Sequence, residues 1–580
     1  MKFFPKKLSL KWINQAYDNN ELTPYELVDE ILKRAEENKD KNIWIVAPSR
    51  ELMEKYISKL PPRSEDKPLW GIPFAIKDNI DLEGVPTTAA CSEYSYMPKK
   101  SAFVVQKLID AGAFPVGKTN LDQFATGLVG TRSPYGEVHN AYDDKMISGG
   151  SSSGSAVSVA LGMAAFSLGT DTAGSGRVPA MLNTLVGFKP SLGAWSTSGV
   201  VPACASLDCV TVFANSLEDT ETVNQYAKGY DTECVWSKEY EDKGKKLPEK
   251  IYLPLEEPAF FGDNADVHKA KWYSATERIK KLGVKVEYID YKMFYDAALI
   301  LYDGAYVAER WADLKEFVSE NEDKVFPVTK KILQSGGTEE KTAARLFEDL
   351  HMLQYYRHKA KEILKNAVMV MPTAGGTFTR EQVREDPVKT NSLMGLYTNH
   401  CNLLDLMAVA VPENTQDKNL PFGITIFGLA DSTNLVLQTA ESFLKTESID
   451  FAVCGLHKKG YALESQLTEL GAEYIESTAT AKEYKLYKLN TNPIKPGLVR
   501  AENGENINID IFKIPVSKLG SFMSNVSTPL SIGNVELIDG RRVKGFLCEE
   551  YAVKDAEDIT SKKVFNIQRR IEHMCSIRLF

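Results

Sequence analysis

Apolar and polar positions along the first, larger part of the chain predict helices and strands in alternation. A helix is expected to begin at Pro24, where Thr23 and Glu26 form a capping box and apolar positions then recur at helical spacing. Short apolar runs predict strands at residues 74–76, 113–120, 250–254, 284–288, 368–373 and 420–428. Helical patterns lie between several of these runs, at 102–111, 267–282 and 435–444. This alternation predicts an α/β fold.

The pattern changes near Glu447. Beyond it, strand-like segments at 450–455, 484–487 and 507–511 alternate with turns rich in Gly, Asn and Pro. Residues 507–511 show the strict apolar–polar alternation of a half-buried strand. We therefore predict two domains, a large one over residues 1–445 and a smaller β-rich α+β domain over residues 449–580.

The segment 148–181 combines two Ser/Gly-rich turns, residues 149–154 and 171–176, with an apolar run of small residues between them. Glycines let the backbone approach a ligand closely, so such turns can aim a serine hydroxyl while neighbouring N–H groups converge on one point. A flexible Ser/Gly linker has a similar composition. The run at 156–166, however, is typical of a buried helix, which favours a nucleophile turn over a linker.

The composition is that of an ordinary globular protein, with 580 residues of which 43% are hydrophobic and 25% charged. The net charge of −9 argues against nucleic acid or an anionic membrane as the main partner, although it leaves room for a local basic pocket. The sequence contains no run of 18 apolar residues that could span a membrane, and its basic beginning lacks the apolar core of a signal peptide.

Eight scattered cysteines form no C-x-x-C pair, which predicts reduced thiols in a cytoplasmic protein. Seven histidines form no H-E-x-x-H pattern. His351 and His358 could share a helix face, but no carboxylate or cysteine joins them in a recognisable ligand set. We predict no metal site and no cofactor.

Three blocks, residues 71–78, 149–154 and 169–180, resemble the signature of the amidase signature family, in the order in which that family carries them. The resemblance covers about residues 20–440. It implies the family's α/β fold, with a mixed central sheet covered by helices.

Matched to these blocks, Ser175 is expected to be the nucleophile, Ser151 a bridging serine held in a cis peptide, and Lys77 the base. A serine hydroxyl needs a base to take its proton, and burial at a strand end lowers the pKa of a lysine toward neutrality. A second hydroxyl can relay the proton over a gap that one side chain cannot span. Taken alone, Lys77 would pass for a surface lysine at the end of a strand.

The backbone N–H groups of the nucleophile turn are the expected oxyanion hole, at Thr172, Ala173, Gly174 and the nucleophile Ser175. Two positions depart from the common family pattern. Ser153 stands where glycine is frequent, and Ala173 replaces a glycine, which makes a positive φ less favourable at that position.

Residues 171–180, 301–310 and 453–472 are similar to one branch of that family, allophanate hydrolase, including the hydrolase part of fungal urea amidolyases. In that branch the segment 301–310 holds the substrate carboxylate, which implies a role for Tyr302 and Arg310. These two residues are about two helical turns apart and could face one pocket. The alternative is that the tyrosine belongs to the core and the arginine to the surface. Arg177 and Gly127 are further expected substrate contacts.

The C-terminal segment resembles the C-terminal domain of the same branch, whose fold is similar to γ-glutamyl cyclotransferase. The resemblance implies that this domain promotes decarboxylation of the first product. We expect His457 to take part, since a histidine can supply a proton or hold a carboxylate. A histidine with a structural hydrogen bond at a strand end is the alternative.

The predicted function is hydrolysis of allophanate to N-carboxycarbamate and ammonia, followed by decarboxylation, with ammonia and carbon dioxide as net products. A general small-amide amidase and the glutaminase subunit of a tRNA amidotransferase are alternatives, disfavoured by the C-terminal domain and by the Tyr302–Arg310 segment. A non-catalytic binding module is disfavoured by the joint presence of Lys77, Ser151 and Ser175.

The resemblance also implies partners and a place in the cell. It predicts a cytoplasmic homodimer in nitrogen metabolism that degrades urea together with a biotin-dependent urea carboxylase, to which some relatives are fused. This chain carries no Met-Lys-Met biotin site, so we expect it to hold only the hydrolase half.

Overall fold

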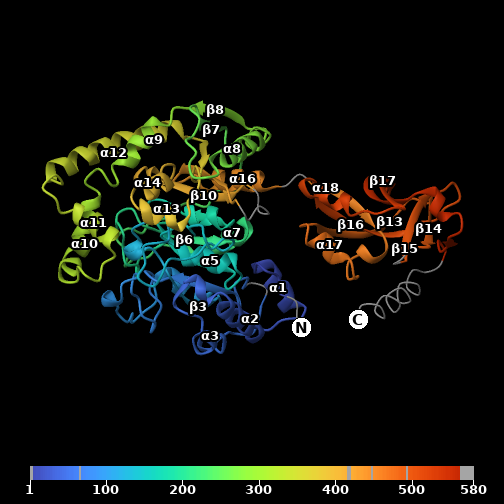
Figure 1. Ribbon diagram of the computed structural model, residues 1–580, viewed down its shortest axis with the longest axis horizontal. Coiled ribbons are helices and arrows are strands. Elements are labelled where there is room, and N and C mark those ends of the chain that lie inside the picture. The colour runs from blue at the N-terminus through green and yellow to red at the C-terminus, as the bar shows by residue number, and fades with distance from the viewer. Residues whose placement is uncertain (1–3, 65–66, 414–419, 446–447, 492–493, 562–580) are drawn as a thin grey trace. The chain divides into compact units, whose positions relative to one another are not determined.

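The structure is a computed structural model that describes residues 4–64, 67–413, 420–445, 448–491 and 494–561. The chain divides into two compact units, Met1–Leu444 and Lys445–Phe580 (Figure 1). The division falls beside the domain boundary predicted from the sequence. The predicted second domain extends to residue 580, and its last part, 562–580, lies outside the described residues.

The first unit combines helices with one large sheet. Its described α-helices are α1 (Leu10–Asp18), α2 (Pro24–Glu37), α3 (Arg50–Ile57), α4 (Phe103–Asp110), α5 (Ser153–Ala160), α6 (Val178–Leu182), α7 (Leu217–Ala227), α8 (Ala265–Lys280), α9 (Lys292–Leu299), α10 (Val307–Glu320), α11 (Pro327–Ser335), α12 (Ala343–Ile363), α13 (Arg380–Glu385), α14 (Lys389–Met394), α15 (His400–Leu403) and α16 (Thr433–Leu444). Its strands are β1 (Trp44–Val46), β2 (Pro73–Lys77), β3 (Phe114–Thr119), β4 (Phe166–Asp171), β5 (Val186–Lys189), β6 (Cys209–Ala214), β7 (Lys250–Pro254), β8 (Lys285–Ile289), β9 (Ala367–Pro372), β10 (Leu406–Pro412) and β11 (Gly423–Leu429).

The eleven strands form one sheet in the order β1-β3-β2-β4-β6-β5-β10-β11-β9-β7-β8. Parallel pairs, such as β2 with β3 and with β4, occur beside antiparallel ones, such as β4 with β6. Every residue of β2, β4 and β10 is buried, and β10 (LMAVAVP) is accordingly a continuous apolar run. Helices α5 and α16 pack on the sheet (Figure 1). The predicted α/β fold with a mixed, helix-covered sheet is confirmed.

The predicted helix between the two Ser/Gly turns is shorter than expected. Helix α5 ends at Ala160, and the chain turns at Gly162, whose φ is +70°. A side chain there would also collide with the Lys6 carbonyl and with Arg34. The apolar residues after the turn continue instead into strand β4, because a buried helix and a buried strand share the same apolar composition.

The second unit is rich in strands, as predicted. Its described elements are β12 (Ser448–Val453), α17 (Glu464–Thr468), β13 (Glu473–Ala479), β14 (Tyr484–Leu489), β15 (Lys495–Arg500), β16 (Asn508–Pro515), α18 (Val516–Ser524), β17 (Leu530–Glu536), β18 (Arg542–Cys548) and β19 (Glu557–Asp558). Five strands form one sheet in the order β13-β16-β12-β18-β17, and β15, β14 and β19 form another. The likeness to γ-glutamyl cyclotransferase stays a prediction.

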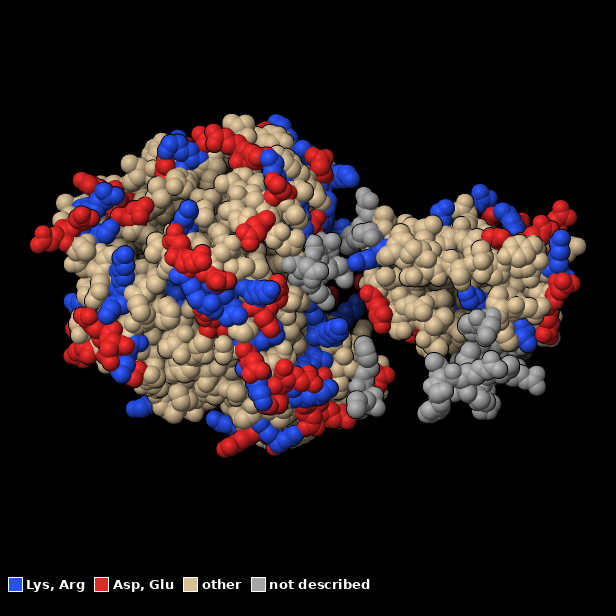
Figure 2. Space-filling view, in the orientation of Figure 1, with Lys and Arg blue, Asp and Glu red and all other residues tan. Residues whose placement is uncertain are grey.

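The described residues also bear on partners and ligands. None of the helices they form is both long and apolar enough to cross a membrane. They contain no group of three or more His, Cys, Asp or Glu side chains arranged to hold a metal ion. All seven cysteines within them are free thiols, and Cys575 lies outside the described part. On the face shown in Figure 2, basic and acidic side chains are intermixed.

Candidate active site

Lys77 lies at the end of strand β2, beside the end of the parallel strand β4. Ile76 is the register partner of Leu168. Because the two strands are parallel, their next residues, Lys77 and Gly169, lie side by side toward the same edge of the sheet. The Lys77 Nζ donates hydrogen bonds to Ser151 Oγ at 2.8 Å and to Thr170 Oγ1 at 2.7 Å. The Gly150–Ser151 peptide bond is cis. The structure thus brings the predicted base and the predicted bridging serine into direct contact.

Burial sets the protonation of Lys77. Its side chain is completely inaccessible to solvent, and this desolvation lowers the pKa of the amine to about 7. The carboxylates of Asp122, Asp208 and Asp171 oppose the change without overcoming it. A large fraction of Lys77 is therefore neutral at physiological pH, which a proton acceptor requires.

Ser175 lies in the turn that follows β4, only 4% exposed. Its hydroxyl contacts the Gly127 carbonyl oxygen at 3.5 Å, a long hydrogen bond. In the described part of the chain, no hydrogen bond joins Ser175 Oγ to Ser151 Oγ. The structure therefore shows the first link of the predicted relay, from Lys77 to Ser151, whereas the second link stays a prediction.

Asp171 closes the nucleophile turn. Its carboxylate accepts hydrogen bonds from the backbone N–H groups of Gly174 and Gly176, each at 2.9 Å. The Nε and Nη2 atoms of Arg177 also donate to it at 2.9 Å. Burial opposes ionisation of Asp171, but the charge of Arg177 holds the pKa of the carboxyl below its usual value. An ionised carboxylate thus fixes the turn from inside.

Two predicted site residues are engaged within the protein in this arrangement, and their predicted roles stay predictions. Gly174 was expected in the oxyanion hole, but its N–H is already engaged by Asp171. Arg177 was expected to contact substrate, but its side chain is wholly buried, forks onto Asp171 and donates to the Thr398 carbonyl at 3.2 Å. The side chain thereby holds the turn.

The remaining amides of the turn fit an oxyanion hole. The N–H groups of Thr172, Ala173 and Ser175 have no hydrogen-bond partner among the residues that the structure describes. Such amides, already fixed in place, can receive the charge that develops on a carbonyl oxygen.

The two departures from the family pattern cause no conflict. Gly174, and not Ala173, takes the positive φ of +135°. A side chain on Gly174 would come within 2.3 Å of Thr398 Oγ1. Ser153 begins α5, and its hydroxyl donates a hydrogen bond to the Asn120 carbonyl at 3.3 Å. The buried hydroxyl that serine adds in place of glycine therefore has a hydrogen-bond partner.

Arg310 and Tyr302 lie together as predicted, though not on one helix. Tyr302 precedes α10, which begins at Val307 and carries Arg310. The guanidinium lies 5.4 Å from the centroid of the tyrosine ring. Arg310 is 1% exposed, and its Nη1 donates to Thr126 Oγ1 at 3.2 Å. Its Nε has no hydrogen-bond partner among the described residues.

The loop residues Thr126 and Gly127 connect Arg310 with Ser175. Thr126 contacts Arg310, and the next residue, Gly127, contacts the nucleophile Ser175. Gly127 must be glycine, because a Cβ there would lie 2.5 Å from Asp122 Oδ2. The predicted nucleophile and the predicted anion-binding arginine thus meet consecutive residues of one loop.

Asp122 and Arg132 support this loop, and neither was singled out from the sequence. The Asp122 carboxylate accepts from the backbone N–H groups of Val129, Gly130 and Arg132, at 2.9–3.3 Å. The Arg132 guanidinium, 2% exposed, donates to the Thr126 carbonyl at 3.0 Å and leaves its Nε without a partner among the described residues. The glycines of this segment, Gly127, Gly130 and Gly136, are the only sequence signal that points to them.

Asp208 is, after Asp171 and Asp122, the third carboxylate near Lys77. It was not singled out from the sequence. It accepts a hydrogen bond from the Thr172 hydroxyl and others from the N–H groups of Ala203 and Cys204. Burial raises the pKa of Asp208 to about 6, against the effect of these donors. The Thr172 side chain is thereby held at the start of the nucleophile turn.

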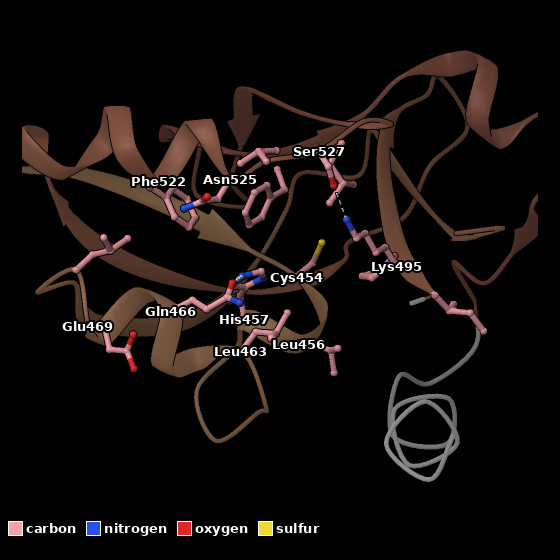
Figure 3. A pocket seen from close by; sticks show the side chains of 16 residues that line it. Cys454, Leu456, His457, Leu463, Gln466, Glu469, Lys495, Phe522, Asn525 and Ser527 are labelled. Carbon is pink, nitrogen blue, oxygen red and sulfur yellow. Dashed lines mark hydrogen bonds between the residues drawn. The ribbon is translucent and has the colours of Figure 1, made fainter. Parts of the chain in front are cut away.

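His457 belongs to the second unit, in a short 3₁₀ helix (Gly455–His457). Its Nε2 lies 3.1 Å from Gln466 Oε1, and its ring packs against Phe546, with centroids 5.3 Å apart. Both polar side chains line a pocket of about 690 Å³ (Figure 3). Burial lowers the pKa of His457, and nearby Lys495 lowers it further.

Comparison with known proteins identifies both units. Residues 26–437 match the Amidase family model, and residues 449–567 match that of the allophanate hydrolase C-terminal domain. The chain is 37% identical to urea amidolyase of Saccharomyces cerevisiae over 595 aligned positions, which is 95% of this chain and 32% of that protein. The chain thus spans about a third of the length of that relative.

Two further relatives bear on the alternatives. A structure of Kluyveromyces lactis allophanate hydrolase is 36% identical, with a TM-score of 0.69 over 98% of this chain and 99% of the other. One subunit of the glutamyl-tRNA(Gln) amidotransferase of Methanosarcina mazei is 32% identical over 67% of this chain and 87% of its own length. The chain belongs to the amidase family of amidohydrolases and carries, after its amidase domain, an allophanate hydrolase C-terminal domain.

Proposed function

We propose that this protein is an allophanate hydrolase in which Ser175 is the nucleophile, Ser151 the bridging serine and Lys77 the base. The observation that carries the proposal is the pair of consecutive loop contacts described above. Thr126 meets the buried Arg310, and Gly127 meets Ser175. The Ser175 hydroxyl and the buried guanidinium of Arg310 therefore contact consecutive residues of a single loop.

The substrate is a small planar anion with an amide at one end. An arginine presents several N–H donors in a rigid fork that matches a carboxylate. Arg310 is buried with an unpartnered Nε, so a bound carboxylate would satisfy a donor that costs free energy when left unpaired. We place the carboxylate of allophanate at Arg310 and Tyr302, and its terminal amide at Ser175.

The first reaction is proposed as follows. Ser175 Oγ attacks the amide carbonyl and its proton passes through Ser151 to neutral Lys77, while the amides of Thr172, Ala173 and Ser175 receive the oxyanion. The C–N bond breaks and ammonia leaves with the returned proton. Water hydrolyses the acyl-serine, so that allophanate and water give the N-carboxycarbamate dianion and ammonium.

The C-terminal domain performs the second reaction, with His457 as a participant. One C–N bond of N-carboxycarbamate breaks, carbon dioxide leaves, and the electron pair stays on nitrogen, which takes a proton to give carbamate. The polar pair formed by His457 and Gln466 at the wall of a mostly apolar pocket supports this role.

The wider setting is proposed from the relatives. Urea amidolyases extend well beyond this chain, and we propose that it acts on the product of a biotin-dependent urea carboxylase, in the cytoplasm and as a homodimer. The alternative of an amidotransferase glutaminase subunit is less well supported. The Methanosarcina mazei relative aligns with 67% of this chain, and the C-terminal domain model accounts for residues that an amidase domain alone does not explain.

A turnover assay tests the proposed first reaction. The full chain is assayed for ammonia release from allophanate, malonamate and neutral malonamide. Allophanate and malonamate, which carry a carboxylate, should be turned over with kcat/KM at least about tenfold above that for malonamide. Ser175→Ala should abolish release, while Ser274→Ala, an exposed serine on α8, should not. Ammonia release by Ser175→Ala at the wild-type rate would contradict the proposal.

A further inference from the structure

The pocket of the C-terminal unit has walls of two kinds. Most of its lining is apolar, with leucines, Ile494, Phe522 and Phe546. The polar side chains of the lining, labelled in Figure 3, are His457, Gln466, Glu469, Lys495, Asn525 and Ser527. Two hydrogen-bonded pairs stand among them, His457 with Gln466 and Lys495 with Ser527. The volume of about 690 Å³ is ample for a molecule of a few heavy atoms between these two groups.

Lys495 is a cation without a counter-ion. Its Nζ donates to the neutral Ser527 hydroxyl at 2.9 Å, shown as a dashed line in Figure 3. Within the described residues no carboxylate lies at ion-pair distance from it, and Glu469, which also lines the pocket, makes no such pair. By contrast, Lys458 and Lys485 of the same unit pair with Asp510 and Asp558.

Lys495 is half-buried, and its hydrogen bond to Ser527 is exposed. An anion that enters between the ammonium and the apolar wall loses part of its hydration, so it is attracted to the charge more strongly than in water. The one hydrogen bond to Ser527 uses a single N–H of the ammonium and aims the group, so two further donors are available to a ligand.

His457 cannot supply this charge. Its pKa is lowered, first by burial and then by Lys495 itself, so that the ring is neutral near pH 7. The two side chains line the same pocket. Since Gln466 Oε1 can only accept, the neutral ring donates from Nε2 and keeps Nδ1 as an acceptor.

We propose that Lys495 is the anion-binding residue of this pocket and that its occupant is a small dicarboxylate, held by one carboxylate at Lys495 and Ser527 while the rest of the molecule faces His457. The proposal rests on the proposed function, because N-carboxycarbamate is such a dicarboxylate. Lys495 holds the carboxylate that stays on nitrogen, and the other carboxylate leaves as carbon dioxide. The C–N electron pair remains on nitrogen, which takes a proton from water to give carbamate.

The test follows both reactions in the full-length chain with carbon-13-labelled allophanate. NMR reports the labelled intermediate and the released carbon dioxide, and a coupled assay reports ammonia. The variants are Lys495→Met, Lys495→Arg and His457→Ala. Lys544→Met is the matched control, because Lys544 also donates to a neutral side chain, Asn534 Oδ1 at 2.9 Å, but does not line the pocket.

The proposal predicts that Lys495→Met consumes allophanate at the wild-type rate while N-carboxycarbamate accumulates and its decarboxylation slows by about tenfold or more. Lys495→Arg should recover most of the rate, since it keeps the charge, and Lys544→Met should behave as wild type. Decarboxylation by Lys495→Met at the wild-type rate, while His457→Ala accumulates the intermediate, would overturn the role of Lys495 and leave the proposed function standing.

Two other outcomes also decide the matter. If His457→Ala decarboxylates at the wild-type rate as well, the proposed second reaction fails, and the role of Lys495 fails with it. If Lys495→Met and Lys495→Arg both lose the first ammonia too, Lys495 serves folding of the chain and the proposal is overturned.

Discussion

Asp171 and Arg177 form a bidentate ion pair inside the protein, with both side chains inaccessible to solvent and two N–H···O contacts of 2.9 Å. The pair encloses the turn that carries Ser175. The same carboxylate also fixes the amides of Gly174 and Gly176, so the shape of the turn depends on a charge that water never reaches.

Removal of one partner of this pair should therefore destabilise the fold and disable the site together. Arg177→Met leaves the Asp171 carboxylate buried without its counter-charge, for which a loss of about 3–5 kcal/mol in the free energy of unfolding is expected. Urea unfolding gives that value, and ammonia release from allophanate gives the activity. Arg177→Lys, which keeps the charge without the fork, should lose less stability; equal losses would show that the fork contributes nothing.

The protonation of Lys77 should appear in the pH profile of the first reaction. The base acts in its neutral form, and burial lowers the pKa of Lys77 to about 7. Below that pH the amine is protonated and cannot accept the serine proton, so kcat/KM for ammonia release should rise with pH through about 7. A profile without an inflection between pH 6 and 8, at a pH where the fold is intact, would contradict the assignment. Lys77→Met should remove activity throughout.

Arg310 should discriminate between charged and neutral amides. Arg310→Met removes a charge-assisted contact worth about 1.5–3 kcal/mol, so KM for allophanate should rise by about 10- to 100-fold. The KM for neutral malonamide should change much less, because that substrate has no carboxylate. Arg50→Met, at an exposed arginine of α3 that pairs with Glu54, is the matched control. Equal rises for both substrates would remove the proposed role.

The nucleophile turn should tolerate a change at one residue and reject it at the next. Ala173→Gly should keep activity, since Ala173 does not take a positive φ. Gly174→Ala should lose at least about tenfold in kcat, because its φ is +135° and the new Cβ would meet Thr398 Oγ1. Combining Gly174→Ala with Thr398→Gly separates the collision from the backbone strain. Full activity of Gly174→Ala alone would show that the turn is not held as described.

The sequence predicted the parts of the site that short motifs carry. Lys77 and Ser151 could be identified because each lies in a block that resembles the amidase signature, and the structure brings them within 2.8 Å. The α/β fold and the β-rich second domain were likewise predictable, because apolar periodicity is a local property.

Other features depend on contacts between residues far apart, and the sequence could not predict them. Arg177 was assigned to the substrate because of its closeness to Ser175 along the chain, but the carboxylate at the end of β4 folds back and engages it. The same carboxylate takes the N–H of Gly174. Asp122 and Arg132 act on loop backbone, for which no side-chain motif is needed.

Because Thr126 and Gly127 are adjacent, we expect the first site to select substrates by length. Arg310 and Ser175 contact consecutive residues, so the spacing between the group that Arg310 would hold and the carbonyl that Ser175 would attack depends on the conformation of this loop. We expect succinamate, which is longer than malonamate by one methylene, to be turned over less well. Selection of substrates by length would then depend on the rigidity of this loop. Asp122, whose carboxylate holds the backbone of the loop, would help to determine which length fits.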